Sequence, residues 1–289
     1  MPKRSPLALA KTHQVRAKGT RVAVHEMGEG PPLVLVHGLG SSALSFSRML
    51  PALARTNRVL AVDLPGFGES DKPFQRFSLR ELGELVLGAI AQLGAANAGW
   101  IGHSMGAQIG LVTSLAHPDR VRSLALLSPA GLERFSRMER WILESTITRR
   151  WVRDQSPAQL RKALDLAFYD TPPEASWLLD RRLALEGEEL AGFAYAFAGG
   201  VRAMLDTPTS RQLTHVKART LVAFGESDRL VPNRMMHPTL SPRRLLSSAK
   251  RRVHECETVL VPRAGHLLPF ERPDEVASML QRFFLAGRH

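Results

Sequence analysis

The chain has 289 residues, of which 44% are hydrophobic and 23% are charged, as in an ordinary folded protein. Its formal net charge is +12, and the basic residues recur along the whole sequence. This composition excludes a disordered or fibrous protein. The scattered charge favours a basic surface over a nucleic-acid partner, and it leaves open a peripheral contact with an anionic membrane.

The sequence predicts neither secretion nor insertion into a membrane. The N-terminus lacks the apolar run of a secretory signal, and no window approaches the roughly 20 apolar residues of a membrane span. The single cysteine, Cys256, can form no intrachain disulfide, and its acidic neighbours make it a poor nucleophile. We therefore expect a soluble, cytoplasmic protein.

Short apolar runs alternate with longer amphipathic segments through much of the chain. The helix expected at 78–93 begins with a capping box formed by Ser78 and Glu81. The alternation is typical of an α/β fold with a mostly parallel sheet covered by helices on both faces. The apolar runs that we expect to form strands are at 31–38, 58–63, 99–102, 121–127, 220–224 and 258–261.

The alternation stops in the middle of the chain, where helical sequence is interrupted by prolines and glycines. We predict a core domain formed by 1–133 and 216–289, with a helical cap subdomain, 134–215, inserted into it. The cap holds half of the chain's eighteen aromatic residues, and we expect some of them to line an apolar pocket. These are Phe135, Trp141, Trp151, Phe168, Tyr169, Trp177, Phe193, Tyr195 and Phe197.

The sequence Gly102-His103-Ser104-Met105-Gly106 matches the pattern G-x-S-x-G. It follows a predicted strand and precedes a run of small residues, 107–116, which we expect to form a helix. A serine on such a tight turn projects its hydroxyl, and the flanking glycines leave room for the strained backbone. Ser104 is therefore the candidate nucleophile.

A serine hydroxyl needs a base within reach and a third group that orients the base. His266 follows the last predicted strand, and Asp228 follows the strand before it. The order Ser104, Asp228, His266 is the order that this architecture uses. Glu226 and Glu133 remain rivals to Asp228 for the role of the acid.

These motifs together resemble the α/β-hydrolase superfamily over nearly the whole chain. The resemblance implies an eight-stranded, mostly parallel sheet, with the cap inserted after the sixth strand. It also implies an oxyanion hole formed by the backbone N–H groups of Leu39 and Met105. The motifs that carry the resemblance are at 37–40, 63–70, 102–106, 225–232 and 265–273.

Other polar residues near these motifs have structural interpretations. We expect His37 to support the oxyanion turn, His103 to pack or form hydrogen bonds, and Asp63 and Asp71 to stabilise a glycine-rich turn. The ten histidines show no metal-ligand spacing, and no dinucleotide-binding motif is present. We therefore predict neither a metal nor a cofactor.

The expected function is a serine hydrolase that cleaves a carboxylic ester or thioester with an apolar portion, through an acyl-enzyme. Two alternatives remain open. One is a carbon–carbon bond hydrolase of the same fold, although such enzymes commonly have Asn before the serine and Trp after the histidine, where this chain has His103 and Leu267. The other is a ligand receptor or scaffold without catalysis. The oligomeric state is left open.

Overall fold

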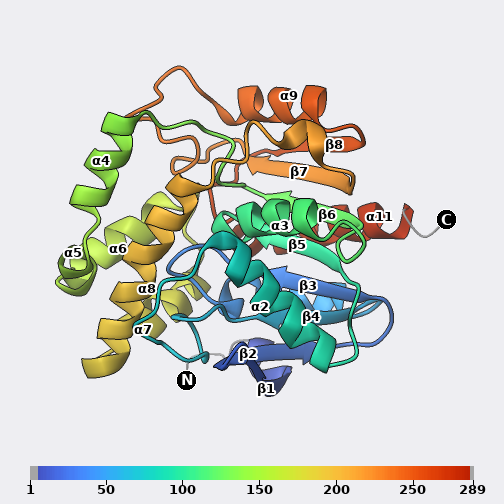
Figure 1. Ribbon diagram of the computed structural model, residues 1–289, viewed down its shortest axis with the longest axis horizontal. Helices are drawn as coiled ribbons and strands as arrows, with labels where there is room; N and C mark the ends of the chain where they lie inside the picture. Colours follow the sequence, from blue (N-terminus) through green and yellow to red (C-terminus); the bar gives the residue numbers. More distant parts are fainter. Residues whose placement is uncertain (1–5, 287–289) are drawn as a thin grey trace.

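The computed structural model describes residues 6–286, which form an eight-stranded sheet in the order β1-β2-β4-β3-β5-β6-β7-β8 (Figure 1). β1 pairs antiparallel with β2, and β2 pairs antiparallel with β4. All pairings from β4 to β8 are parallel, so the predicted fold class is confirmed. The strands are β1 Lys11–Ala17, β2 Thr20–Met27, β3 Pro32–Val36, β4 Arg58–Val62, β5 Gly99–His103, β6 Ser123–Leu127, β7 Arg219–Gly225 and β8 Cys256–Val261.

The central strands are buried on both faces. In β3, β4, β5 and β6 every residue after the first is buried, which explains why each appears as an uninterrupted apolar run. Two hydrophobic clusters lie on opposite faces of the sheet. One contains side chains of α2, α3 and α9, and the other contains side chains of α1 and α11.

Eleven α-helices occur in the described residues, and most of those outside the insertion cover the sheet (Figure 1). The capping box predicted for α2 is present, since Ser78 Oγ accepts the Glu81 N–H and the Glu81 carboxylate accepts the Ser78 N–H. The helices of the core are α1 Leu50–Leu53, α2 Leu79–Gln92, α3 Met105–Ala116, α9 Pro242–Arg252, α10 Leu268–Glu271 and α11 Pro273–Ala286.

The chain leaves the sheet after β6 and returns to it at β7, as the resemblance implied. The intervening helices lie beside the carboxyl ends of the parallel strands (Figure 1). They belong to the segment predicted as the cap, and they are α4 Arg137–Thr146, α5 Arg149–Arg153, α6 Pro157–Leu166, α7 Ser176–Leu183 and α8 Gly187–Asp206. No helix within residues 6–286 is long and apolar enough to cross a membrane.

Candidate active site

Ser104 lies on the turn between β5 and α3, with φ 53° and ψ −115°. This positive φ is unfavourable for a residue with a side chain, so packing must hold the turn in place. Gly106 approaches β3 so closely that a Cβ there would lie 2.0 Å from the carbonyl oxygen of Val36. A Cβ on Gly102 would lie 2.4 Å from the Gly106 oxygen. Both glycines are therefore needed for the turn that displays Ser104.

His266 and Asp228 form a buried pair beside this turn. His266 Nδ1 donates to Asp228 Oδ2 at 2.9 Å, while Asp228 Oδ1 accepts the N–H groups of Leu230 and Val231, each at 2.9 Å. Burial favours the neutral acid, but the charge and hydrogen bond of His266 and these two N–H groups hold the pKa of Asp228 below its ordinary value. Because Nδ1 is the donor in this contact, Nε2 is the acceptor nitrogen of the neutral imidazole.

The two rival carboxylates make other contacts. Glu133 is buried, and its Oε2 accepts the Asn233 N–H at 2.8 Å and a hydrogen bond from His237 Nδ1 at 2.7 Å. Burial raises the pKa of Glu133 despite these two partners. Glu226 lies at the surface, where it accepts from Arg243 Nη2 at 2.6 Å. Of the three carboxylates, Asp228 is the one that contacts His266.

His103, which precedes Ser104, turns towards the backbone of His266. Its Nε2 donates to the carbonyl oxygen of His266 at 2.9 Å, and the two rings lie 4.8 Å apart between centroids. Burial, aided by the nearby His266, lowers the pKa of His103 to about 3. His103 is therefore neutral at physiological pH, and its contact fixes the main chain that carries His266.

The residues predicted to form the oxyanion hole, Leu39 and Met105, belong to two turns that meet at Ser104. A Cβ on Gly38 would lie 3.0 Å from Ser104 Cβ, so the 38–40 turn rests against the serine. The N–H groups of Leu39 and Met105 make no hydrogen bond to any residue in the described range 6–286. His37 supports the turn, since its Nδ1 donates to Gly38 O at 2.7 Å and its Nε2 accepts the Leu64 N–H at 3.0 Å.

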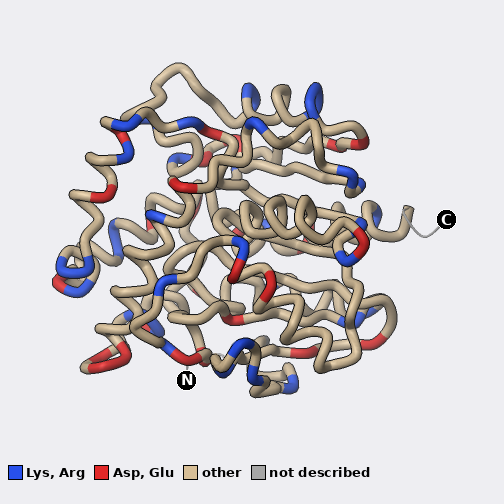
Figure 2. The backbone as a smooth tube through the Cα atoms, in the orientation of Figure 1, with Lys and Arg blue, Asp and Glu red and all other residues tan. Residues whose placement is uncertain are grey.

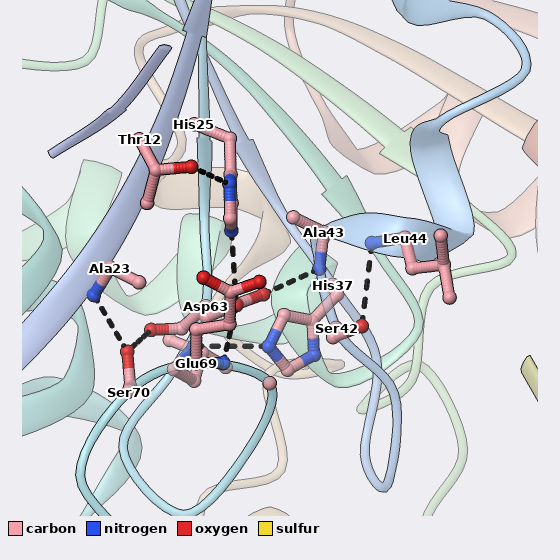
Figure 3. A network of polar contacts seen from close by, with 12 residues as sticks. Thr12, Ala23, His25, His37, Ser42, Ala43, Leu44, Asp63, Glu69 and Ser70 are labelled. Atoms are coloured by element: carbon pink, nitrogen blue, oxygen red, sulfur yellow. Dashed lines mark hydrogen bonds and ion pairs between the residues drawn. The ribbon is translucent and has the colours of Figure 1, made fainter. Parts of the chain in front are cut away.

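Asp63 ties this turn to the glycine-rich loop that follows β4 (Figure 3). Its carboxylate accepts the N–H groups of Ala43 at 2.7 Å and Glu69 at 2.8 Å, and it accepts from His25 Nε2 at 3.1 Å. Burial alone would raise the pKa of Asp63, but the hydrogen bond and charge of His25 hold it below its ordinary value. Asp71 accepts the backbone N–H and Nε–H of Arg21. Both aspartates therefore stabilise turns.

Ser104 and His266 open onto one pocket of about 920 Å³, which Leu39 also lines. Within residues 6–286 no hydrogen bond joins Ser104 Oγ to His266, a contact that is commonly long in hydrolases without substrate. Three of the nine aromatic residues of the predicted cap line this pocket, namely Trp151, Phe193 and Phe197. The pocket is therefore bounded by the core on one side and by the insertion on the other.

The other cap aromatics lie elsewhere. Phe168 and Trp177 pack against Phe270 in a separate cluster, whereas Trp141 and Tyr169 are exposed. Sequence reasoning did not single out the half-buried Arg182, which lines the pocket, because only the folded insertion places its guanidinium 4.8 Å from the centre of the Phe193 ring.

Possible metal ligands and the single thiol were located within residues 6–286. Among the described residues there is no group of three or more His, Cys, Asp or Glu side chains that could hold a metal ion. Cys256 is buried on β8, and this burial raises the pKa of its thiol to about 11. The thiol is therefore a weak nucleophile at neutral pH.

Comparison with known proteins identifies the family. The model of the alpha/beta hydrolase family matches residues 33–279, which span the Ser104 turn, the insertion and His266. The chain belongs to this family. The resemblance drawn from the motifs is confirmed, and the chain is an α/β-hydrolase enzyme.

Similar proteins within the family differ in their chemistry. This α/β hydrolase is 32% identical over 256 residues to the dihydrolipoyllysine-residue acetyltransferase component of the acetoin cleaving system of Pseudomonas putida, covering 88% of this chain but only 63% of that relative. It is 28% identical over 233 residues to the 2-hydroxymuconate semialdehyde hydrolase of Pseudomonas sp. (strain CF600), covering 76% of this chain and 78% of the relative. The two relatives are therefore similar to this chain over much of its length but are named for different reactions.

One similar solved structure is that of a membrane phospholipase A described as a novel bacterial virulence factor. It superimposes with a TM-score of 0.79 at 28% sequence identity, covering 99% of this chain and 89% of that one. The fold is shared over essentially the full length of the chain.

Proposed function

We propose that this α/β hydrolase is a serine hydrolase that cleaves a carboxylic ester or thioester with an apolar portion. The observation that carries the proposal is the buried Asp228–His266 pair. In this pair Nδ1 of His266 donates to Asp228, which makes Nε2 the acceptor of the neutral imidazole, and the histidine opens onto the same pocket as Ser104. A hydroxyl, a base and an orienting carboxylate in this order are what acyl transfer requires.

In the first half of the proposed reaction, Ser104 Oγ attacks the carbonyl carbon while His266 Nε2 takes the hydroxyl proton. The negative charge that develops on the carbonyl oxygen is met by the N–H groups of Leu39 and Met105. Each such donor is typically worth about 3 kcal/mol of transition-state stabilisation. The tetrahedral intermediate then collapses, and the leaving alcohol or thiol departs with the proton from His266.

In the second half, water attacks the acyl group on Ser104. His266 Nε2 removes a proton from this water and returns it to Ser104 Oγ as the carboxylic acid leaves. Asp228 stays ionised throughout, because its lowered pKa keeps the carboxylate charged at neutral pH. It stabilises the imidazolium formed in each half and holds the proton of Nδ1 in place.

The apolar portion of the substrate is inferred from the wall of the pocket. Phe193 and Phe197 face the 38–40 turn, since a Cβ on Gly40 would lie 2.5 Å from Phe197 Cε2 and 3.8 Å from Phe193 Cζ. Their rings lie 6.0 Å apart between centroids. An acyl chain or apolar alcohol bound beside Ser104 would therefore contact aromatic rings.

The test is hydrolysis of a series of p-nitrophenyl esters of increasing acyl length, with labelling by a fluorophosphonate. We expect wild-type protein to turn over at least one ester and to be labelled at Ser104. Ser104→Ala should remove the label and lower kcat by at least about a thousandfold. Folded wild-type protein with neither turnover nor labelling would show the proposal to be wrong.

A second candidate function is hydrolysis of a carbon–carbon bond in a substrate that bears a carboxylate. Arg182 favours it, because this half-buried side chain lines the pocket and forms no ion pair with any described residue. Its Nη2 donates to Val152 O at 2.7 Å, and burial lowers its pKa. The similarity to a 2-hydroxymuconate semialdehyde hydrolase points the same way. His103 and Leu267 depart from the pattern of such enzymes, so we place this function second.

Assays with a 2-hydroxy-6-oxo-dienoate as substrate distinguish the two candidate functions. The second candidate predicts that this compound is cleaved faster than any neutral ester, and that Arg182→Gln raises its KM by about tenfold because one charged hydrogen bond is lost. KM for a neutral ester serves as the internal control and should not change. Failure to cleave the dienoate, with ester turnover intact, rejects the second candidate alone.

A further inference from the structure

Helix α4 presents an apolar stripe to solvent. The helix has no buried residue, and Met138, Trp141 and Ile142 are 65%, 64% and 40% exposed. Their spacing of three and four residues puts them on one side of the helix. Figure 1 shows α4 on the outer edge of the molecule, away from the sheet. A stripe of this kind normally packs against a core, and here it has none.

The side of α4 that carries Arg140 and Glu144 contacts α8 through ion pairs, and the apolar stripe therefore faces solvent. Glu144 accepts from Arg202 Nη2 at 2.7 Å and from Arg202 Nε at 3.0 Å. One turn earlier, Arg140 pairs with Asp206. These contacts settle which side of the helix meets the protein. The apolar stripe is therefore a stable feature of the surface.

Helix α5 extends this surface. It begins three residues after α4 ends, and Val152 is buried while its neighbour Trp151 is 44% exposed. Trp151 also lines the pocket of Ser104. We call Met138, Trp141, Ile142 and Trp151, with the arginines between and beside them, the docking face.

Basic residues outnumber acidic ones along α4 and α5 (Figure 2). Residues 134–154 contain six arginines and three acidic residues. Arg134, Arg137 and Arg149 form no ion pair with any residue in the described range 6–286, and Arg149 lies 4.1 Å from the centre of the Tyr195 ring. Exposed tryptophan beside unpaired arginine suits the boundary between lipid headgroups and acyl chains.

We propose that the docking face binds the surface of an anionic phospholipid bilayer. Met138, Trp141 and Ile142 enter the outer part of the acyl-chain region, and Arg134, Arg137 and Arg149 contact lipid phosphates. Helix α9 is the natural comparison because it is also strongly basic. Its large apolar residues, Leu245 and Leu246, are buried, so its exposed side has charge without an apolar stripe. Unlike α9, the docking face therefore combines positive charge with exposed apolar area.

Docking in this way would bring the pocket close to the bilayer, because Trp151 belongs to both. This inference does not depend on the proposed ester chemistry, since lipid binding can be measured with the catalytic serine replaced. A failed lipid-binding test and a failed esterase test are therefore distinguishable.

The experiment is flotation of the full chain with vesicles of phosphatidylcholine alone or with about 30% phosphatidylglycerol. We expect binding to the anionic vesicles, weaker binding at high salt, and little binding to the neutral ones. The variant M138S/W141S/I142S should bind at least about tenfold more weakly because it loses the inserted side chains. R134Q/R137Q should weaken binding by a similar factor, because each basic residue near the surface contributes to attraction.

Matched controls are available elsewhere on the surface. Met235 is 95% exposed and lies outside the docking face, so M235S should bind as wild type does. R244Q/R251Q removes two exposed charges from α9, and it should weaken binding much less than R134Q/R137Q. Unchanged melting temperatures would show that all variants are folded, and Trp141→Ser alone is the milder substitute if the triple variant is unstable.

Three results would overturn the proposal. The first is a wild-type protein that binds no anionic vesicle. The second is an equal loss in the α9 variant, which would assign the attraction to general charge. The third is a dimer in sedimentation that M138S/W141S/I142S dissociates, which would show that a second copy of the chain covers the face.

Discussion

Asp228 and Glu133 are buried carboxylates on segments that follow neighbouring strands, yet they differ in what they touch. Asp228 accepts from His266, whereas Glu133 accepts from His237 and from the Asn233 N–H. We expect Asp228→Asn to lower kcat by about 10⁴-fold, because an amide no longer holds the proton on Nδ1 of His266. The measurement is kcat for the best p-nitrophenyl ester.

Glu133→Gln is the matched control for this prediction. It changes a carboxylate into an amide at a similar depth but leaves the His266 pair intact, so kcat should fall by less than about tenfold. Equal losses in the two variants would contradict the assignment of the acid. A larger loss in Glu133→Gln would assign the role to Glu133.

At the scale of single residues, sequence motifs could predict Ser104 and His266, which line the pocket, and Asp228, which contacts His266, but not how their surroundings are arranged. Ser104, Asp228 and His266 were found from their positions after strands and from their order along the chain. The bond from His103 to the His266 carbonyl joins residues 163 positions apart, and Arg182 reaches the pocket only through the packing of α7. Neither contact leaves a local pattern in the sequence.

At the scale of the element, the close contact between α3 and β3 holds the Ser104 turn in place. A Cβ on Gly106 would meet the Val36 carbonyl at 2.0 Å, and backbone atoms have little freedom to move away. We expect Gly106→Ala to lower the free energy of unfolding by about 3 kcal/mol or more, through backbone displacement. Urea denaturation followed by circular dichroism measures this change.

Gly88→Ala in α2 is the comparison for Gly106→Ala. A Cβ on Gly88 would have its nearest neighbour, Ala17 Cβ, at 3.8 Å, an ordinary contact. Alanine is the better helix former, so this variant should be neutral or more stable by up to about 1 kcal/mol. A Gly106→Ala variant as stable as Gly88→Ala would mean that the turn tolerates displacement, contrary to the close packing.

The sequence predicts six strands, whereas the sheet has eight, and the two additional strands are β1 and β2. The runs that form β3, β4, β5, β6 and β7 are almost fully buried and are therefore uninterrupted apolar sequence, and the run in the edge strand β8 is apolar although only partly buried. β1 lies at the edge of the sheet, and most of its residues are exposed or only partly buried, so Lys11–Ala17 resembles a polar loop. β2 is more buried, but its arginine, histidine and glutamate interrupt the apolar run. β1 and β2 can be recognised as strands only from their antiparallel pairing in the folded sheet.

At the scale of the whole molecule, the His25–Asp63 pair joins the N-terminal hairpin to the turns that carry the candidate site (Figure 3). Protonated His25 donates from Nε2 to Asp63 and from Nδ1 to Thr12 Oγ1, 3.0 Å away. Burial alone would lower the pKa of His25, but the hydrogen bond and charge of Asp63 outweigh it and raise the pKa above the ordinary 6.5. The pKa of Asp63 is correspondingly below its ordinary 3.8.

These shifts give the pair a defined pH window. The contribution of His25 to stability is complete below pH 6.5 and is lost as the pH rises through its raised pKa. The contribution of Asp63 is complete above pH 3.8 and is lost as the pH falls through its lowered pKa. Between these limits both groups are charged in the folded protein, and the pair stabilises the fold most.

We therefore expect His25→Gln to lower the free energy of unfolding by about 2–3 kcal/mol at roughly pH 5.5, and by progressively less as the pH rises towards roughly pH 9 through the raised pKa of His25. Urea denaturation at the two pH values measures both losses. His254→Gln, at an exposed histidine without a hydrogen bond in the described chain, should change stability by less than about 0.5 kcal/mol at either pH. If His25→Gln lowers the free energy of unfolding equally at both pH values, the packing of the His25 side chain, and not its charge, stabilises the contact between the hairpin and the site.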